Sequence, residues 1–155
     1  MQSDEKVFSK AIFPIDFCAF WLYNGARLYW GEKYVGEVYA IVSGKGGTGK
    51  TSVCAGLAAA LAEQGKKVLC IDCDVGLRNL DISLGMSDCG ALSFLDVCQG
   101  SYSLEDACRH PKYETLFFLT APMNTPIEDI SRETFGKMLL DARARFDFVF
   151  LDAPA

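Results

Sequence analysis

The 155-residue sequence has a single histidine, five prolines and no excess of basic residues. Its formal net charge of −5 argues against a broad nucleic-acid-binding surface, so no specific nucleic acid is expected as a partner. His110 lies in a polar Arg-His-Pro-Lys turn, where we expect an exposed side chain without a partner. No internal repeat or low-complexity linker divides the chain. Its hydrophobic fraction of 50% and charged fraction of 23% are typical of a globular protein.

No secretory signal is evident, because the N-terminus begins with the acidic pair Asp4-Glu5 rather than with basic residues. The seven cysteines are odd in number and scattered, which fits reduced thiols in a cytoplasm. Cys70 and Cys73 form a C-x-x-C pattern on an expected strand. Residues three apart on a strand point to opposite faces, so we expect neither a metal site nor a redox pair there.

Residues 1–36 form an atypical leader that does not match the pattern of the remainder. The segment 11–30 is crowded with aromatic residues, but Pro14 and two charges interrupt it. A membrane helix needs about 20 mainly apolar residues, so an interfacial anchor is the remaining membrane alternative. The codons of Trp30-Gly31-Glu32 must be purine-rich and resemble a ribosome-binding site, and the codon of Val35 can be the alternative start GTG. We therefore interpret the leader as non-native, with translation starting at Val35.

From residue 37 to residue 155 strand and helix patterns alternate, with short connections between them. Continuous apolar runs predict strands, and apolar residues at helical spacing, such as Val53, Leu57 and Leu61, predict helices. This alternation indicates an α/β fold of the P-loop NTPase type, a parallel sheet flanked by helices. Strands are expected at 38–42, 68–73, 116–119 and 146–151, helices at 51–64, 92–99, 104–109 and 127–144, and a loop at 74–85.

A glycine-rich turn follows the first expected strand and matches the phosphate-loop pattern G-x-x-x-x-G-K-[ST] over its whole length. Glycine lets backbone N–H groups approach a triphosphate closely, and the following helix points its positive dipole end at the phosphates. Lys50 supplies a charge for the outer phosphates, and the Thr51 hydroxyl can ligate Mg²⁺. The alternative is a plain glycine-rich turn, which the flanking strand and alanine-rich helix argue against. The turn consists of Gly44, Lys45, Gly46, Gly47, Thr48, Gly49, Lys50 and Thr51.

Aspartates follow two other expected strands. Asp152 ends the apolar run FVFLD, as the Walker-B carboxylate that holds Mg²⁺ through water does in P-loop proteins. Asp72 lies near the end of the second expected strand and Asp74 just past it, at the edge where open α/β sheets bind their ligands. Asp74 can order an attacking water or the metal's hydration shell. The alternative for both is a structural role, capping the loop or the next helix.

Two features resemble the MinD/ParA family of deviant Walker A ATPases. Lys45 directly follows Gly44, as the signature lysine does in that family, and the segment 76–81, Gly-Leu-Arg-Asn-Leu-Asp, is similar to its septum-placing branch. The resemblance covers residues 36–155. It implies ATP and Mg²⁺ as ligands, a homodimer formed on ATP binding, and Lys45 reaching the partner's nucleotide. It further implies catalytic roles for Lys45, Lys50 and Asp74, and metal binding by Thr51, Asp74 and Asp152.

The resemblance also implies a cellular role. It predicts an ATPase that regulates division-septum placement, with a division inhibitor and a topological-specificity factor as partners. Family members continue beyond the position of Ala155 and bind the inner membrane surface through a C-terminal helix, so the chain matches their N-terminal half. Without the later strands we expect the phosphate-loop strand to have an unpaired apolar edge. A partition or flagellar-placement ATPase, and a nucleotide-binding fragment without turnover, are the alternatives.

Overall fold

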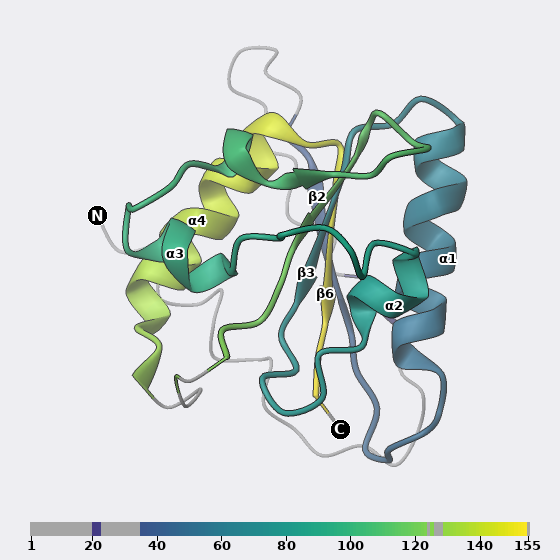
Figure 1. Cartoon of the computed structure of the whole chain (residues 1–155), viewed down its shortest axis with the longest axis horizontal. Helices are drawn as coiled ribbons and strands as arrows, with labels where there is room; N and C mark the ends of the chain where they lie inside the picture. The colour runs from purple at the N-terminus through teal and green to yellow at the C-terminus, as the bar shows by residue number, and fades with distance from the viewer. Residues whose placement is uncertain (1–19, 23–34, 124, 126–128, 155) are drawn as a thin grey trace.

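A computed structural model of the chain describes residues 20–22, 35–123, 125 and 129–154. The predictions for Trp30-Gly31-Glu32 and for most of the leader lie outside these residues. The described elements form one six-stranded sheet with helices on both faces (Figure 1). In chain order they are β1 (Phe20–Leu22), β2 (Glu37–Ile41), α1 (Lys50–Glu63), β3 (Val68–Asp72), α2 (Leu80–Leu84), α3 (Phe94–Cys98), a 3-10 turn (Leu104–Asp106), β4 (Cys108–Arg109), β5 (Leu116–Leu119), α4 (Arg132–Arg145) and β6 (Phe148–Asp152).

The strand order is β1-β2-β6-β3-β5-β4, and the four inner strands run parallel. Of the described strands, only β1 and β4, at the two edges, pair antiparallel to their neighbours. Strands β3 and β5 are buried along their whole length, as expected for uninterrupted apolar runs covered on both faces. This arrangement confirms the predicted α/β fold class.

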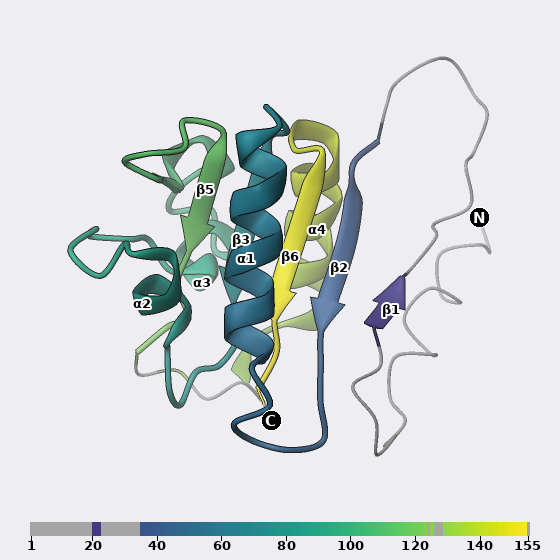
Figure 2. The same cartoon turned by 90° about the vertical axis from the view of Figure 1, so that its right-hand side faces the viewer.

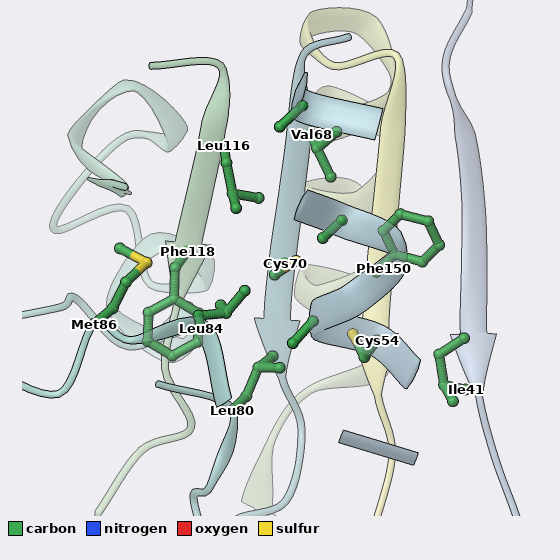
Figure 3. Packing of buried hydrophobic residues seen from close by; sticks show 13 residues of the cluster. Ile41, Cys54, Val68, Cys70, Leu80, Leu84, Met86, Leu116, Phe118 and Phe150 are labelled. Carbon is green, nitrogen blue, oxygen red and sulfur yellow. The ribbon is translucent and has the colours of Figure 1, made fainter. Parts of the chain in front are cut away.

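The two faces of the sheet have separate apolar cores. Helices α1 and α2 cover one face, and α3 and α4 cover the other (Figures 1 and 2). Figure 3 shows the first core, in which Cys54 of α1 lies over Cys70 and Phe150 of the sheet. Cys73 packs on the second core, which confirms that Cys70 and Cys73 face opposite sides.

Helix α1 packs on the first core through small residues and through two of the three larger apolar residues predicted for its buried face. Cys54, Ala58 and Ala62 are buried, and Leu57 and Leu61 pack partly buried against the same core. Val53 is 41% exposed, so its predicted burial was wrong. The small residues let the helix approach the sheet closely. In α4, Met138 is buried as predicted.

Two predicted segments have different secondary structure. The loop 74–85 contains α2, whose Leu80 and Leu84 are buried on the α1 side of the sheet. The segment 104–109 is not one helix, because Ser103 and Asp106 cap a single 3-10 turn and β4 follows it. Helix α4 begins at Arg132, where the Ser131 hydroxyl accepts a hydrogen bond from the Thr134 N–H. Residues 127 and 128 of the predicted helix lie outside the described part.

The prediction for His110 was wrong. The side chain is buried, its Nε2 lies 2.9 Å from the Leu84 carbonyl oxygen, and its Nδ1 accepts hydrogen bonds from the N–H groups of Lys112 and Tyr113. Because Nδ1 accepts twice, Nε2 carries the proton and donates it to Leu84. His110 therefore joins the end of α2 to the turn between β4 and β5.

The edge of β2 is also paired, contrary to the prediction. Strand β1 lies beside it and runs antiparallel (Figure 2). Trp21 pairs with Ala40, the central pair of three. Residues 39–41 of β2 are therefore paired, and β1 as described does not extend to Glu37 and Val38.

Candidate nucleotide site

Three neighbouring strands end at the same level of the sheet. Ile41 of β2 is in register with Asp152 of β6, and Asp152 is in register with Asp72 of β3. The glycine-rich turn therefore starts beside Asp152, and Asp74 begins the adjacent loop. The sheet thus brings the predicted residues to one edge, the carboxyl ends of the parallel strands, where open α/β sheets bind ligands.

The glycine-rich turn 44–51 follows β2 and ends in the first turn of α1, and its residues 44–48 are exposed to solvent. Gly49 is the N-cap of α1 with φ 85°, a left-handed conformation that favours glycine. A Cβ added at Gly46, Gly47 or Gly49 would meet no atom within 4 Å. These glycines are therefore not required by packing within the chain. The uncapped helix start and the open backbone fit a phosphate group held by N–H donors.

Ser43, which the motif does not include, ties the turn together. Its hydroxyl donates to the Lys45 carbonyl oxygen at 2.8 Å and lies 2.7 Å from the Thr48 hydroxyl. The Lys50 Nζ donates to the same Ser43 oxygen at 3.4 Å, so the ammonium lies over the turn. The Lys45 ammonium has neither a hydrogen-bond nor an ion-pair partner among the described residues. Lys50 therefore serves its own turn, whereas Lys45 is free to act elsewhere.

Asp152 is 2% exposed, and its Oδ1 is buried without a hydrogen-bond partner in the described part of the chain. Burial raises the pKa of this carboxyl, while a hydrogen bond from Thr51 and the charge of Lys50 lower it. A buried oxygen without a partner calls for a missing ligand, and a carboxylate beside a hydroxyl is the donor set that Mg²⁺ prefers. Asp152 and Thr51 therefore fit a magnesium ion, held directly or through water.

Asp74 is half-buried, and its Oδ1 accepts hydrogen bonds from the N–H groups of Gly76 and Leu77, both at 3.1 Å. One oxygen thus caps the loop, as the structural alternative expected. Asp72 is 1% exposed and also accepts two backbone hydrogen bonds. Burial is the main cause that raises its pKa to about 6.

Arg78 is a further residue at this edge that the motifs assigned no role. Its backbone is left-handed, with φ 47°, and its Nε and Nη2 both donate to the Thr120 hydroxyl, at 3.1 and 2.9 Å. It therefore fastens the loop after β3 to the end of β5. No signal in the sequence pairs Arg78 with Thr120, 42 residues away.

Comparison with known proteins identifies the family. Residues 39–142 match the CobQ/CobB/MinD/ParA nucleotide binding domain. The chain belongs to this family. Among its relatives, the septum site-determining protein MinD of Thermotoga maritima is 38% identical over 122 residues, which are 78% of this chain and 45% of that protein. MinD of Escherichia coli K12 is also 38% identical, over 77% of this chain and 45% of its own.

Solved structures agree with this assignment. The MinC:MinD cell division protein complex of Aquifex aeolicus matches with a TM-score of 0.66 and 36% identity, over 77% of this chain and 48% of that one. MinD of Pyrococcus horikoshii, solved with Mg-ADP, matches with a TM-score of 0.58 and 34% identity, over 76% and 48%. A ParA family ATPase from Chlorobium tepidum, at 23% identity, shares the fold. The chain thus spans about half the length of the relatives it matches.

The described residues contain no cluster of three or more histidine, cysteine or acidic side chains that could hold a metal ion. None of their helices has the length and apolar character to cross a membrane.

Proposed function

We propose that this chain binds and hydrolyses ATP with Mg²⁺ and, as part of an ATP-dependent dimer, regulates division-septum placement. The observation that carries this proposal is the convergence at one sheet edge of the open turn 44–51, Asp74 and the unpartnered buried oxygen of Asp152. The family assignment and the relatives named MinD support the same conclusion.

Each residue of the site has a role in this proposal. The N–H groups of the turn and the Lys50 ammonium bind the phosphates, while Thr51 and Asp152 hold Mg²⁺, which neutralises phosphate charge. Asp74 orients the attacking water through the carboxylate oxygen that does not cap the loop, and it also contributes to the hydration shell of the metal.

Lys45 acts across the dimer. Its side chain is exposed on the turn and is free of partners among the described residues, so it can reach the nucleotide of a second copy. Two lysine ammonium groups that face one triphosphate repel each other unless the anion lies between them. Formation of the dimer therefore depends on ATP. ADP has one phosphate fewer and favours the pair less.

Septum placement is favoured over partition by the relatives themselves. Proteins named MinD are 35–39% identical to this chain, whereas the ParA family structure is 23% identical. A MinC-type inhibitor is the proposed partner, since a relative is solved in complex with MinC.

A MinE-type stimulating factor and cycling between cytoplasm and inner membrane surface follow from the family resemblance. Loss of the gene should then give minicells and polar septa rather than lost plasmids or extra flagella.

Light scattering of the chain with ADP or Mg·ATP tests the site and the pairing together. We expect the mass to rise with Mg·ATP only. Lys45→Ala should bind ATP with a Kd within a few-fold of the unchanged chain but stay monomeric, and Lys50→Ala should lose ATP binding. Lys66→Ala, an exposed lysine after α1, is the control and should behave like the unchanged chain. Equal pairing with ADP, or ATP binding that survives Lys50→Ala, would contradict the proposal.

A further inference from the structure

Asp72 is a buried carboxylate at the sheet edge, and each of its two oxygens accepts a backbone hydrogen bond. The side chain is 1% exposed at the end of β3. Its Oδ1 accepts from the Asp74 N–H at 2.9 Å, and its Oδ2 accepts from the Leu80 N–H at 3.2 Å. The two oxygens therefore bind the first turn of the loop and the first residue of α2, two points six residues apart.

These two bonds fix the loop between them. Asp74 caps the N–H groups of Gly76 and Leu77, and its carbonyl oxygen accepts from the Arg78 N–H at 3.1 Å. Each of these contacts depends on where the Asp74 backbone lies, and Asp72 holds that backbone. Displacement of the Asp72 carboxylate would therefore move the Asp74 side chain relative to Asp152 and Thr51.

The surroundings of Asp72 disfavour an ionised carboxylate, so its charge is costly if its role is only to accept hydrogen bonds from the loop. Among the described residues no cation forms an ion pair with it, and Asp152 is its register neighbour on β6. Two buried carboxylates on adjacent strands repel each other, and a neutral side chain would avoid this cost. A cation bound beside Asp152 and Asp74 would offset it.

We propose that Asp72 is a positioning residue, which holds Asp74 in place for the Mg²⁺-bound nucleotide through its two backbone hydrogen bonds. This inference rests on the proposed function, because it assumes that Mg·nucleotide binds at this edge. It assigns Asp72 no contact with the nucleotide or the metal.

The test measures binding of a fluorescent ATP analogue, first in EDTA and then in a Mg²⁺ titration, alongside a thermal melt. In Asp72→Ala we expect binding in EDTA within about twofold of the unchanged chain, since the turn and Lys50 are intact. The Mg²⁺ concentration for half-saturation should rise at least tenfold. Asp72→Asn keeps one acceptor oxygen. Its half-saturating Mg²⁺ concentration should lie between those of the unchanged chain and Asp72→Ala.

Asp147→Ala is the matched control. The Asp147 Oδ2 also accepts a backbone hydrogen bond, from the Lys67 N–H at 2.8 Å, but just before β6, at the opposite end of that strand from Asp152. Its Mg²⁺ dependence should equal that of the unchanged chain, whatever its melting temperature. An Asp72→Ala variant that melts lower but keeps the original Mg²⁺ dependence would show a merely structural role and overturn the inference.

Two further outcomes are decisive. If the unchanged chain binds no ATP, the proposed function fails and this inference fails with it, whereas a failure confined to the Mg²⁺ dependence overturns the inference alone. If neither Asp72 variant folds, hydrogen exchange in the unchanged chain decides. The Asp74 and Leu80 amides should then exchange more slowly with Mg·ATP than with ATP in EDTA, and equal rates would overturn the inference.

Discussion

At the scale of single residues, the edge of the sheet holds two buried carboxylates on neighbouring strands. Burial is the main cause that raises the pKa of both Asp72 and Asp152. An ionised carboxylate in such a place destabilises the ligand-free fold, and a bound cation would reverse this effect. Binding function and ligand-free stability therefore oppose each other here, as at many active sites.

Asp152→Asn tests this opposition directly. Removing the charge should raise the melting temperature of the ligand-free chain, while the Mg²⁺-dependent increase in ATP affinity should fall at least tenfold. A melt and an ATP titration with and without Mg²⁺ measure the two effects. A lower melting temperature together with unchanged Mg²⁺ dependence would mean that Asp152 is a structural residue.

Asp72 makes stability depend on pH. Its pKa is about 6 in the folded chain, against an ordinary value of 3.8. Between these values the folded chain keeps a proton that the unfolded chain has released, so the free energy of unfolding falls as the pH rises from about 4 to about 6. The urea midpoint should fall over this range, and it should fall less in Asp72→Asn. An equal fall in both proteins would contradict the assignment.

The motif residues could be predicted from the sequence because the residues that determine their positions lie close to them in the chain. The turn 44–51 is set by its own glycines, and Asp152 follows its own strand. Ser43 was missed because it lies just before the motif, although its partners Lys45, Thr48 and Lys50 lie within the motif. Arg78 and His110 could not be predicted, because Thr120 and Leu84, which they contact, lie far along the chain. His110 contacts Leu84, 26 residues away, and its polar sequence surroundings conceal its burial.

At the scale of elements, α1 determines how closely the site is held against the sheet. Its N-terminus carries the phosphate turn, and its buried face consists of small residues such as Ala58, which is fully buried. The sequence predicted the alanine-rich helix and the packing of Leu57, but it also placed Val53 on the apolar face, and Val53 is 41% exposed. The five-residue α2 was missed since one helical turn gives no clear period.

Ala58→Leu should lower the free energy of unfolding by about 1–3 kcal/mol, because the added methyl groups overpack the contact between α1 and the sheet. Ala60→Leu, the same substitution on the exposed side of α1, is the control and should change it by less than about 0.5 kcal/mol. Urea unfolding measures both variants. Equal effects would mean that α1 does not pack on the sheet through its alanines.

His110→Ala should lower the free energy of unfolding by about 2 kcal/mol, because it leaves a buried carbonyl and two N–H groups without partners. Glu114→Ala, an exposed neighbour, should have little effect in the same urea titration. A change as small as that of the control would place His110 at the surface, as the sequence alone suggested.

At the scale of the whole molecule, the residues of the proposed phosphate and metal site follow three adjacent strands, β2, β6 and β3. The alternation of strands and helices predicted a parallel sheet, but it did not predict that β6 lies between β2 and β3. The pairing of β1 with β2 could not, because no clean period marks β1 in the sequence. Because one contiguous sheet carries the turn and both carboxylate loops, we expect this chain itself to bind Mg·ATP.

A thermal melt with and without Mg·ATP tests that claim most directly, with Lys50→Ala as the paired variant. ATP at 100 times its Kd should stabilise the fold by about 2.7 kcal/mol, which raises the melting temperature by roughly 5–10 °C for a domain of this size. We expect this rise in the unchanged chain and no rise in Lys50→Ala. No rise in the unchanged chain, or an equal rise in both, would contradict it.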